Sequence, residues 1–121
     1  MTVILIVEDD QSIRELVELI LQDGGYETIS ASDVAEAAQL LCSRQPIDAV
    51  FTDIHLKSAL LGGCEVARLA EACRPGMPIL YTTGEPGPEK LKAQFPKDSH
   101  LLRKPYTQSD LLGSVKESLR A

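Results

Sequence analysis

The apolar positions of this chain form short runs that alternate with amphipathic stretches from one end to the other. Residues 3–7 are five consecutive apolar residues rich in Val and Ile, as in a parallel strand covered on both faces. Similar runs predict further strands at 47–52, 77–83 and 101–102, and a short alternating stretch predicts another strand at 26–31. Because helical stretches separate these strands, we expect an α/β fold: a doubly wound parallel sheet with helices on both faces.

Apolar residues three and four positions apart predict the intervening helices. Ser12 and Asp33 are each followed three residues later by glutamate, the capping-box pattern of a helix start. Further helices are expected at 64–73 and from 107–110 to the end of the chain. Three prolines within 84–98 confine any helix in that segment to 89–95.

Composition narrows the class of protein. A chain of 121 residues predicts one domain, 1–121, without an output domain. The net charge of −6 and the absence of a Lys/Arg stripe argue against a nucleic-acid partner. There is no signal-peptide pattern and no apolar run approaching about 20 residues, so we expect a cytoplasmic protein without a membrane partner.

The three cysteines, Cys42, Cys64 and Cys73, lack the spacing of a metal site. Their odd number gives no disulfide framework. We therefore expect each to be a small packing residue of a helix, kept reduced in the cytoplasm.

Polar residues follow four of the predicted strands where each strand ends. Glu8-Asp9-Asp10 follows the first strand, Asp53 the third, Thr83 the fourth and Lys104-Pro105 the fifth. The carboxyl ends of parallel strands share one sheet edge, where open α/β sheets bind their ligands. The order therefore predicts a site with several carboxylates, one hydroxyl and one ammonium group.

These side chains suit phosphoryl chemistry with a divalent metal. Clustered carboxylates repel one another, and Mg²⁺ with its preference for oxygen ligands relieves that repulsion. Asp53 could act as a nucleophile toward a phosphoryl donor. Thr83 could then donate to a phosphoryl oxygen, and Lys104 could pair with Asp53 or its phosphate. Lys104-Pro105 is a candidate for a cis peptide bond. Each residue also has an ordinary structural explanation, as a helix-capping acid, a loop aspartate or a polar group at a strand end.

As an ordered set, Glu8-Asp9, Asp53, Thr83-Gly84 and Lys104-Pro105-Tyr106 resemble the receiver domains of two-component response regulators over essentially the whole chain. The resemblance implies a flavodoxin-like five-stranded parallel sheet of strand order 2-1-3-4-5. It implies that Asp53 accepts phosphate from a histidine kinase or a histidine phosphotransfer protein. It also implies that Glu8, Asp9, Asp53 and the backbone carbonyl of His55 hold Mg²⁺, while Thr83 moves toward the phosphate and Lys104 binds it. Asp10 is not a usual ligand of the family and is expected to start the first helix.

Three positions depart from the family pattern. Leu101 stands three residues before the lysine, where family members that couple a threonine to an aromatic ring carry Tyr or Phe. We therefore expect a different readout, or one that relies on backbone movement after Thr83. The loop after Asp53 is one or two residues longer than usual, and its Leu60 and Leu61 either fold back over the next helix or contact a partner. His55 and Glu85 occupy the two places where side chains tune the lifetime of the phosphoryl group.

The resemblance implies a stand-alone phosphorelay switch that docks to a kinase or phosphotransfer protein and to a downstream protein target, and we expect a monomer or weak homodimer. It would not be an enzyme beyond self-phosphorylation and autodephosphorylation at Asp53. One alternative is a degenerate receiver that binds partners without phosphorylation. Another is an aspartate-nucleophile phosphohydrolase, but such enzymes carry a second aspartate two residues after the nucleophile, where this chain has His55.

Overall fold

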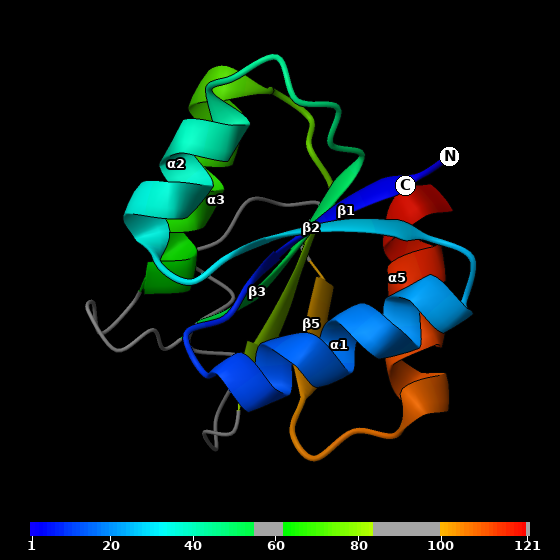
Figure 1. Ribbon diagram of the computed structural model, residues 1–121. Helices are drawn as coiled ribbons and strands as arrows, with labels where there is room; N and C mark the ends of the chain where they lie inside the picture. The colour runs from blue at the N-terminus through cyan, green and yellow to red at the C-terminus, as the bar shows by residue number, and fades with distance from the viewer. Residues whose placement is uncertain (55–61, 84–99, 121) are drawn as a thin grey trace.

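The computed structural model describes residues 1–54, 62–83 and 100–120, with a parallel sheet at the centre. The five strands lie in the order β2-β1-β3-β4-β5 and all neighbouring pairs are parallel (Figure 1). Both the fold class and the strand order predicted above are confirmed. The strands are β1 Val3–Val7, β2 Glu27–Ala31, β3 Ala49–Asp53, β4 Ile79–Thr83 and β5 His100–Arg103.

The helices cover the two faces of this sheet in pairs. Figure 1 shows α2 and α3 together on one side and α1 and α5 on the other. Their bounds are α1 Gln11–Asp23, α2 Val34–Leu41, α3 Gly62–Cys73 and α5 Gln108–Arg120. None of the helices in the described ranges is long and apolar enough to span a bilayer. The helix expected within 84–98 lies outside the described residues.

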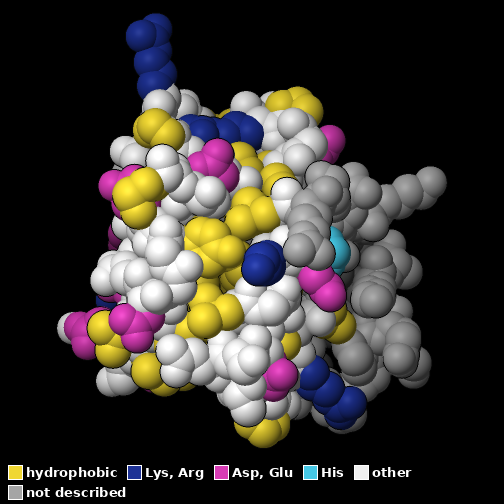
Figure 2. All heavy atoms as spheres, turned by 90° about the vertical axis from the view of Figure 1, so that its right-hand side faces the viewer, with side chains coloured by type: hydrophobic (Ala, Val, Ile, Leu, Met, Phe, Trp, Pro, Cys, Tyr) yellow, Lys and Arg dark blue, Asp and Glu magenta, His cyan; other side chains and the backbone are white. Residues whose placement is uncertain are grey.

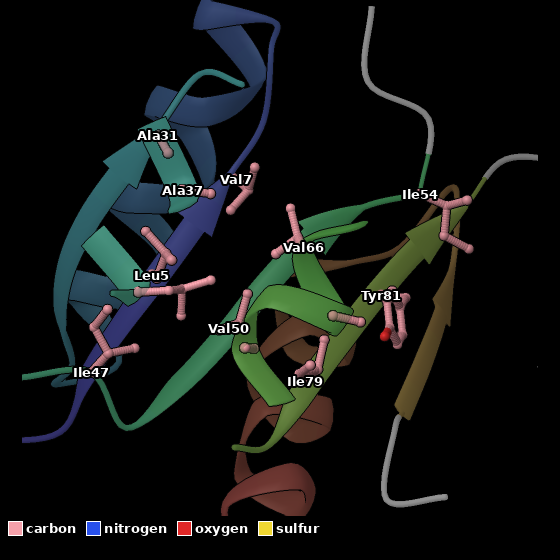
Figure 3. Packing of buried hydrophobic residues seen from close by; sticks show 13 residues of the cluster. Leu5, Val7, Ala31, Ala37, Ile47, Val50, Ile54, Val66, Ile79 and Tyr81 are labelled. Atoms are coloured by element: carbon pink, nitrogen blue, oxygen red, sulfur yellow. The ribbon is translucent and has the colours of Figure 1, made fainter. Parts of the chain in front are cut away.

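Each face of the sheet has its own apolar core because strand side chains point alternately to opposite sides. Along β1, Leu5 and Val7 face α2 and α3, whereas Ile4 and Ile6 face α1 and α5. Figure 3 shows the first of these cores, in which α3 places Val66 over β3 and β4. β1, β3 and β4 are fully buried along their lengths, which explains their uninterrupted apolar sequences.

The helix starts are set by polar side chains. Asp33 caps α2 by accepting a hydrogen bond from the Glu36 backbone N–H at 2.8 Å, as predicted. The predicted Ser12 cap is wrong: α1 begins at Gln11, and Asp10 accepts from the Ile13 backbone N–H at 3.0 Å. The expectation that Asp10 starts the helix is thereby confirmed.

The expectation of reduced, packed cysteines is also wrong for two of the three, and the side chain of Cys64 lies outside the described part of the chain. A disulfide joins Cys42 to Cys73, 31 positions later in the sequence. Cys42 is the C-cap residue of α2, and Cys73 is the last residue of α3. Both residues are exposed rather than packed inside their helices. The pair comes together because α2 and α3 lie side by side on one face of the sheet, an arrangement that cysteine spacing does not reveal.

Candidate functional site

Strand register brings the predicted site residues to one edge of the sheet. Asp53, the last residue of β3, lies beside Thr82 of β4, and Thr83 lies beside Arg103 of β5. Glu8 follows β1 directly and donates its backbone N–H to the Ala31 carbonyl at the end of β2. The acids, the threonine and the lysine therefore gather where four strands end.

The central contact of the site is an ion pair between Lys104 and Asp53. Lys104 Nζ lies 2.7 Å from Asp53 Oδ2. The Lys104 backbone N–H also donates to the Thr83 carbonyl at 2.8 Å, which fixes the start of the lysine segment against β4. The Lys104-Pro105 peptide bond is cis, as predicted. Asp53 is 6% exposed, so its carboxylate is held in a largely desolvated position beside one cation.

Glu8 is an acid of the site whose pKa is raised. It is only 2% exposed, and burial raises the pKa of its carboxyl from 4.5 to about 7. A hydrogen bond with the Asp9 side chain and the charge of Asp53 contribute to this rise, whereas the Asp10 backbone N–H, 3.1 Å from Glu8 Oε1, and Lys104 oppose it. The edge thus concentrates more negative charge than Lys104 alone offsets.

A sequence model of the response regulator receiver domain matches residues 4–116 of this chain. The chain belongs to this family. Receiver domains are signalling modules of two-component systems rather than enzymes of general metabolism. The family assignment rests on nearly the whole chain, including all five strands.

Solved receiver structures share both the sequence and the fold. The response regulator receiver protein of Sinorhizobium medicae is 32% identical, with a TM-score of 0.90 over 99% of this chain and 95% of that one. The chemotaxis protein CheY4 of Vibrio cholerae is 31% identical, with a TM-score of 0.81 over 98% of each chain. Full-length similarity to such proteins agrees with the parallel order β2-β1-β3-β4-β5.

The curated relatives are larger proteins. The CAI-1 autoinducer sensor kinase/phosphatase CqsS of Vibrio cholerae is 34% identical over 93% of this chain, which spans 16% of its length. Response regulator MprA of a Mycobacterium species is 31% identical over 97% of this chain, which spans 50% of its length. The similarity therefore concerns only part of each of these relatives.

The described residues supply oxygen donors suited to a hard cation without forming a closed metal centre. Within 1–54, 62–83 and 100–120, no group of three or more Asp, Glu, His or Cys side chains is arranged to hold a metal ion. The carboxylates of Glu8, Asp9 and Asp53 nevertheless have the chemistry that Mg²⁺ prefers, which includes positions left for water and phosphate oxygens. Burial is the main cause of the raised pKa of Glu8, so its charged form is unfavourable here, and a bound cation would favour that form. The donor set fits Mg²⁺.

β5 carries Leu101 where some family members carry an aromatic residue, and the neighbouring strand β4 carries an aromatic residue beside it. Leu101 of β5 lies directly beside Tyr81 of β4, and both contact the core under α2 and α3. Tyr81 is fully buried and precedes Thr83 by two positions, so both residues point to the same face of β4. The large ring on this face is therefore carried by β4 instead of β5.

Tyr106 is a site neighbour to which sequence reasoning gave no role. It is partly buried against the core under α1 and α5. Burial raises the pKa of its hydroxyl, and the negative charges of Glu8 and Asp53 raise it further. Its position directly after Lys104-Pro105 belongs to the residue set that carries the family resemblance, but no role was predicted for its side chain. His55, Glu85, Leu60 and Leu61 lie outside the described residues.

Proposed function

We propose that this receiver domain accepts a phosphoryl group on Asp53 from a phosphohistidine of a histidine kinase or a histidine phosphotransfer protein, and that phosphorylation switches its binding to a downstream protein. The observation that carries the proposal is the 2.7 Å pair between Lys104 Nζ and Asp53 Oδ2 at the carboxyl edge of the sheet. A nucleophilic carboxylate and a cation for the incoming phosphate are already adjacent there.

In the transfer step, a carboxylate oxygen of Asp53 attacks the phosphorus of the donor. A new O–P bond forms as the P–N bond to the donor imidazole breaks, and the imidazole nitrogen retains the bonding electron pair. The product on Asp53 is an acyl phosphate. Lys104 then pairs with a phosphoryl oxygen, and the Thr83 hydroxyl donates to another.

Glu8, Asp9 and Asp53, together with the backbone carbonyl of His55, would hold Mg²⁺ in this proposal. Bound Mg²⁺ would supply positive charge that offsets both the carboxylates and the phosphoryl oxygens. Asp10 has a separate task, because its side chain caps α1. The chain's own contribution is to hold the acids, Lys104 and Thr83 at one edge before the donor arrives.

The donor protein is proposed to dock on α1. This helix begins at Gln11, directly after the acids, and presents Leu16 and Leu19 at 57% and 61% exposure. Figure 2 shows hydrophobic side chains reaching the surface on the side of the molecule that carries α5. Leu16→Gln should slow phosphotransfer from a phosphohistidine protein while leaving phosphorylation by a small phosphodonor unchanged. Equal slowing with both donors would contradict docking on α1.

We propose that phosphorylation is signalled to the partner through Tyr81. Movement of Thr83 toward the phosphate would shift the Tyr81 side chain on the same face of β4. This coupling takes the place of an aromatic ring at Leu101. Tyr81→Leu should leave phosphate uptake at Asp53 intact and weaken the change in partner binding. If phosphorylation changed partner binding of Tyr81→Leu as much as that of the wild type, Tyr81 would not carry the signal. Backbone movement after Thr83 would then carry it.

Intact-mass measurement tests the phosphoacceptor. The purified protein is incubated with Mg²⁺ and a small phosphodonor, in parallel with Asp53→Asn and with an EDTA-treated sample. We expect one phosphate adduct in the wild type and none in the two others. No adduct in the wild type would favour the degenerate partner-binding module, and sustained turnover of a small phosphate ester would favour a phosphohydrolase.

A further inference from the structure

The disulfide lies away from the phosphoryl site. α2 ends at Leu41, before β3 begins, and α3 ends at Cys73, before β4 begins. Both helices therefore end at the sheet edge where the strands start, opposite the edge that carries Asp53. Figure 1 shows the two helices packed side by side. The Cα atoms of Cys42 and Cys73 are 5.4 Å apart, within the usual range for a disulfide.

The two helix ends are also held together without the covalent bond. Arg74, directly after Cys73, donates from Nε to the Leu41 carbonyl at 2.9 Å and from a terminal nitrogen to the Ser43 carbonyl at 2.9 Å. These carbonyls belong to the residues on either side of Cys42. Apolar residues of both helices join the same core, including Ala37 and Val66. Reduction would therefore leave the two thiols close together.

The position also favours exchange chemistry. Cys42 and Cys73 are both exposed, so a small thiol can reach the sulfur atoms. The Arg74 guanidinium binds the carbonyls of the residues on either side of Cys42 and so places a positive charge at this end of the disulfide. Nearby positive charge is a common feature of reactive cysteines in proteins. The guanidinium also offsets the negative end of the α2 dipole at this cap. A buried structural cystine has neither property.

We propose that Cys42 and Cys73 form a reversible thiol–disulfide site that latches α3 to α2 and responds to the redox state of small thiols. On closing, one sulfur–sulfur bond forms in the protein and the sulfur–sulfur bond of oxidised glutathione breaks. The two protein thiols lose two protons and two electrons, which the two glutathione molecules gain. Opening is the reverse exchange with reduced glutathione.

The latch should be visible in the stability of the helix pair. A cross-link across 31 positions restricts the unfolded chain, and for a domain of this size the expected rise in the unfolding temperature is roughly 10 °C. Amide hydrogen exchange should slow at the ends of α2 and α3, because opening of one helix end then requires movement of both. These effects do not depend on phosphorylation of Asp53.

The test follows the folded protein through a redox cycle in native buffer. Protein reduced with dithiothreitol is transferred to oxidised glutathione and examined by intact mass, peptide mapping and thermal unfolding. We expect the loss of two hydrogens, one Cys42–Cys73 linked peptide, the temperature rise, and full return on renewed reduction. Cys64→Ser is the matched control and should behave as the wild type, whereas Cys42→Ser and Cys73→Ser should show neither the link nor the rise.

Three outcomes would overturn the proposal. The thiols could remain free, or carry only separate glutathione adducts, in excess oxidised glutathione. The cystine could resist reduction until the protein is unfolded, which would make it a permanent structural bond. The link could instead join two chains. Arg74→Ala adds a kinetic arm: the disulfide should close several-fold more slowly than in the wild type, and an unchanged rate would contradict the role given to the guanidinium.

Discussion

Glu8→Gln should stabilise the metal-free protein at alkaline pH. The Glu8 carboxyl is almost fully buried, and burial with neighbouring acids raises its pKa from 4.5 to about 7. Glutamine keeps the shape of the side chain and cannot ionise. Above pH 7, the wild type must hold a charged, desolvated carboxylate that the variant lacks.

The size and the sign of the effect follow from the pKa change. Between pH 4.5 and 7 the folded state binds more protons at Glu8 than the unfolded state does, so the free energy of unfolding falls as the pH rises. One pKa unit corresponds to about 1.4 kcal/mol. The rise in the pKa of Glu8 therefore corresponds to about 3 kcal/mol, which is present below pH 4.5 and lost above pH 7.

The assay is urea unfolding of the wild type and Glu8→Gln at pH 5 and pH 8, with EDTA and with Mg²⁺. With EDTA, the variant should gain up to about 3 kcal/mol over the wild type between pH 5 and pH 8. Mg²⁺ at pH 8 should restore stability to the wild type and much less to the variant. Glu117→Gln, a change on the exposed surface of α5, is the control and should show neither trend. A pH-independent difference between wild type and Glu8→Gln would refute the assigned charge state of Glu8.

Three substitutions in or beside the site, one of them with a matched control, test separate roles. Lys104→Met removes the partner of the buried Asp53 carboxylate and should lower the free energy of unfolding by about 1–2 kcal/mol. The expected loss is this small because Lys104 is partly exposed and solvent screens its charge. It should also reduce phosphate uptake measured by intact mass, and unchanged uptake would contradict the role of Lys104. Asp10→Ala and its matched control Asp33→Ala each remove a helix cap and should each cost about 1 kcal/mol in urea unfolding. Both should still be phosphorylated, and loss of phosphorylation in Asp10→Ala alone would assign Asp10 to the metal site. His55→Ala should change the half-life of phosphorylated Asp53 in a time course of intact mass, and an identical half-life would exclude His55 as a tuning residue.

Much of the fold follows from local pattern. The continuous apolar run of β1 and the Asp33–Glu36 helix start are each decided by a few neighbouring residues, and the structure agrees with both. The strand order follows from the family resemblance, since apolar runs do not say which strands are neighbours. The order of polar residues at strand ends was enough to predict the pairing of Lys104 with Asp53.

What could not be predicted depends on contacts between distant parts of the chain. Local pattern alone did not decide between Asp10 and Ser12 as the cap of α1, and only the family resemblance favoured Asp10. In the structure the Glu8 carboxylate accepts the Asp10 backbone N–H, a contact that the capping pattern does not include. The Cys42–Cys73 bond depends on α2 and α3 ending side by side. The burial of Glu8, and hence its raised pKa, likewise depends on packing that residue type alone does not express.

The most direct test of the account is the chemical location of the phosphoryl group. The protein is phosphorylated with Mg²⁺ and a small phosphodonor, treated with borohydride to reduce an acyl phosphate to an alcohol, digested and sequenced by mass spectrometry. The account predicts that Asp53, and no other residue, is converted to homoserine, and that omission of the phosphodonor abolishes the conversion. Conversion at Glu8, Asp9 or Asp10 in place of Asp53, or none at all in protein that carries phosphate, would contradict it.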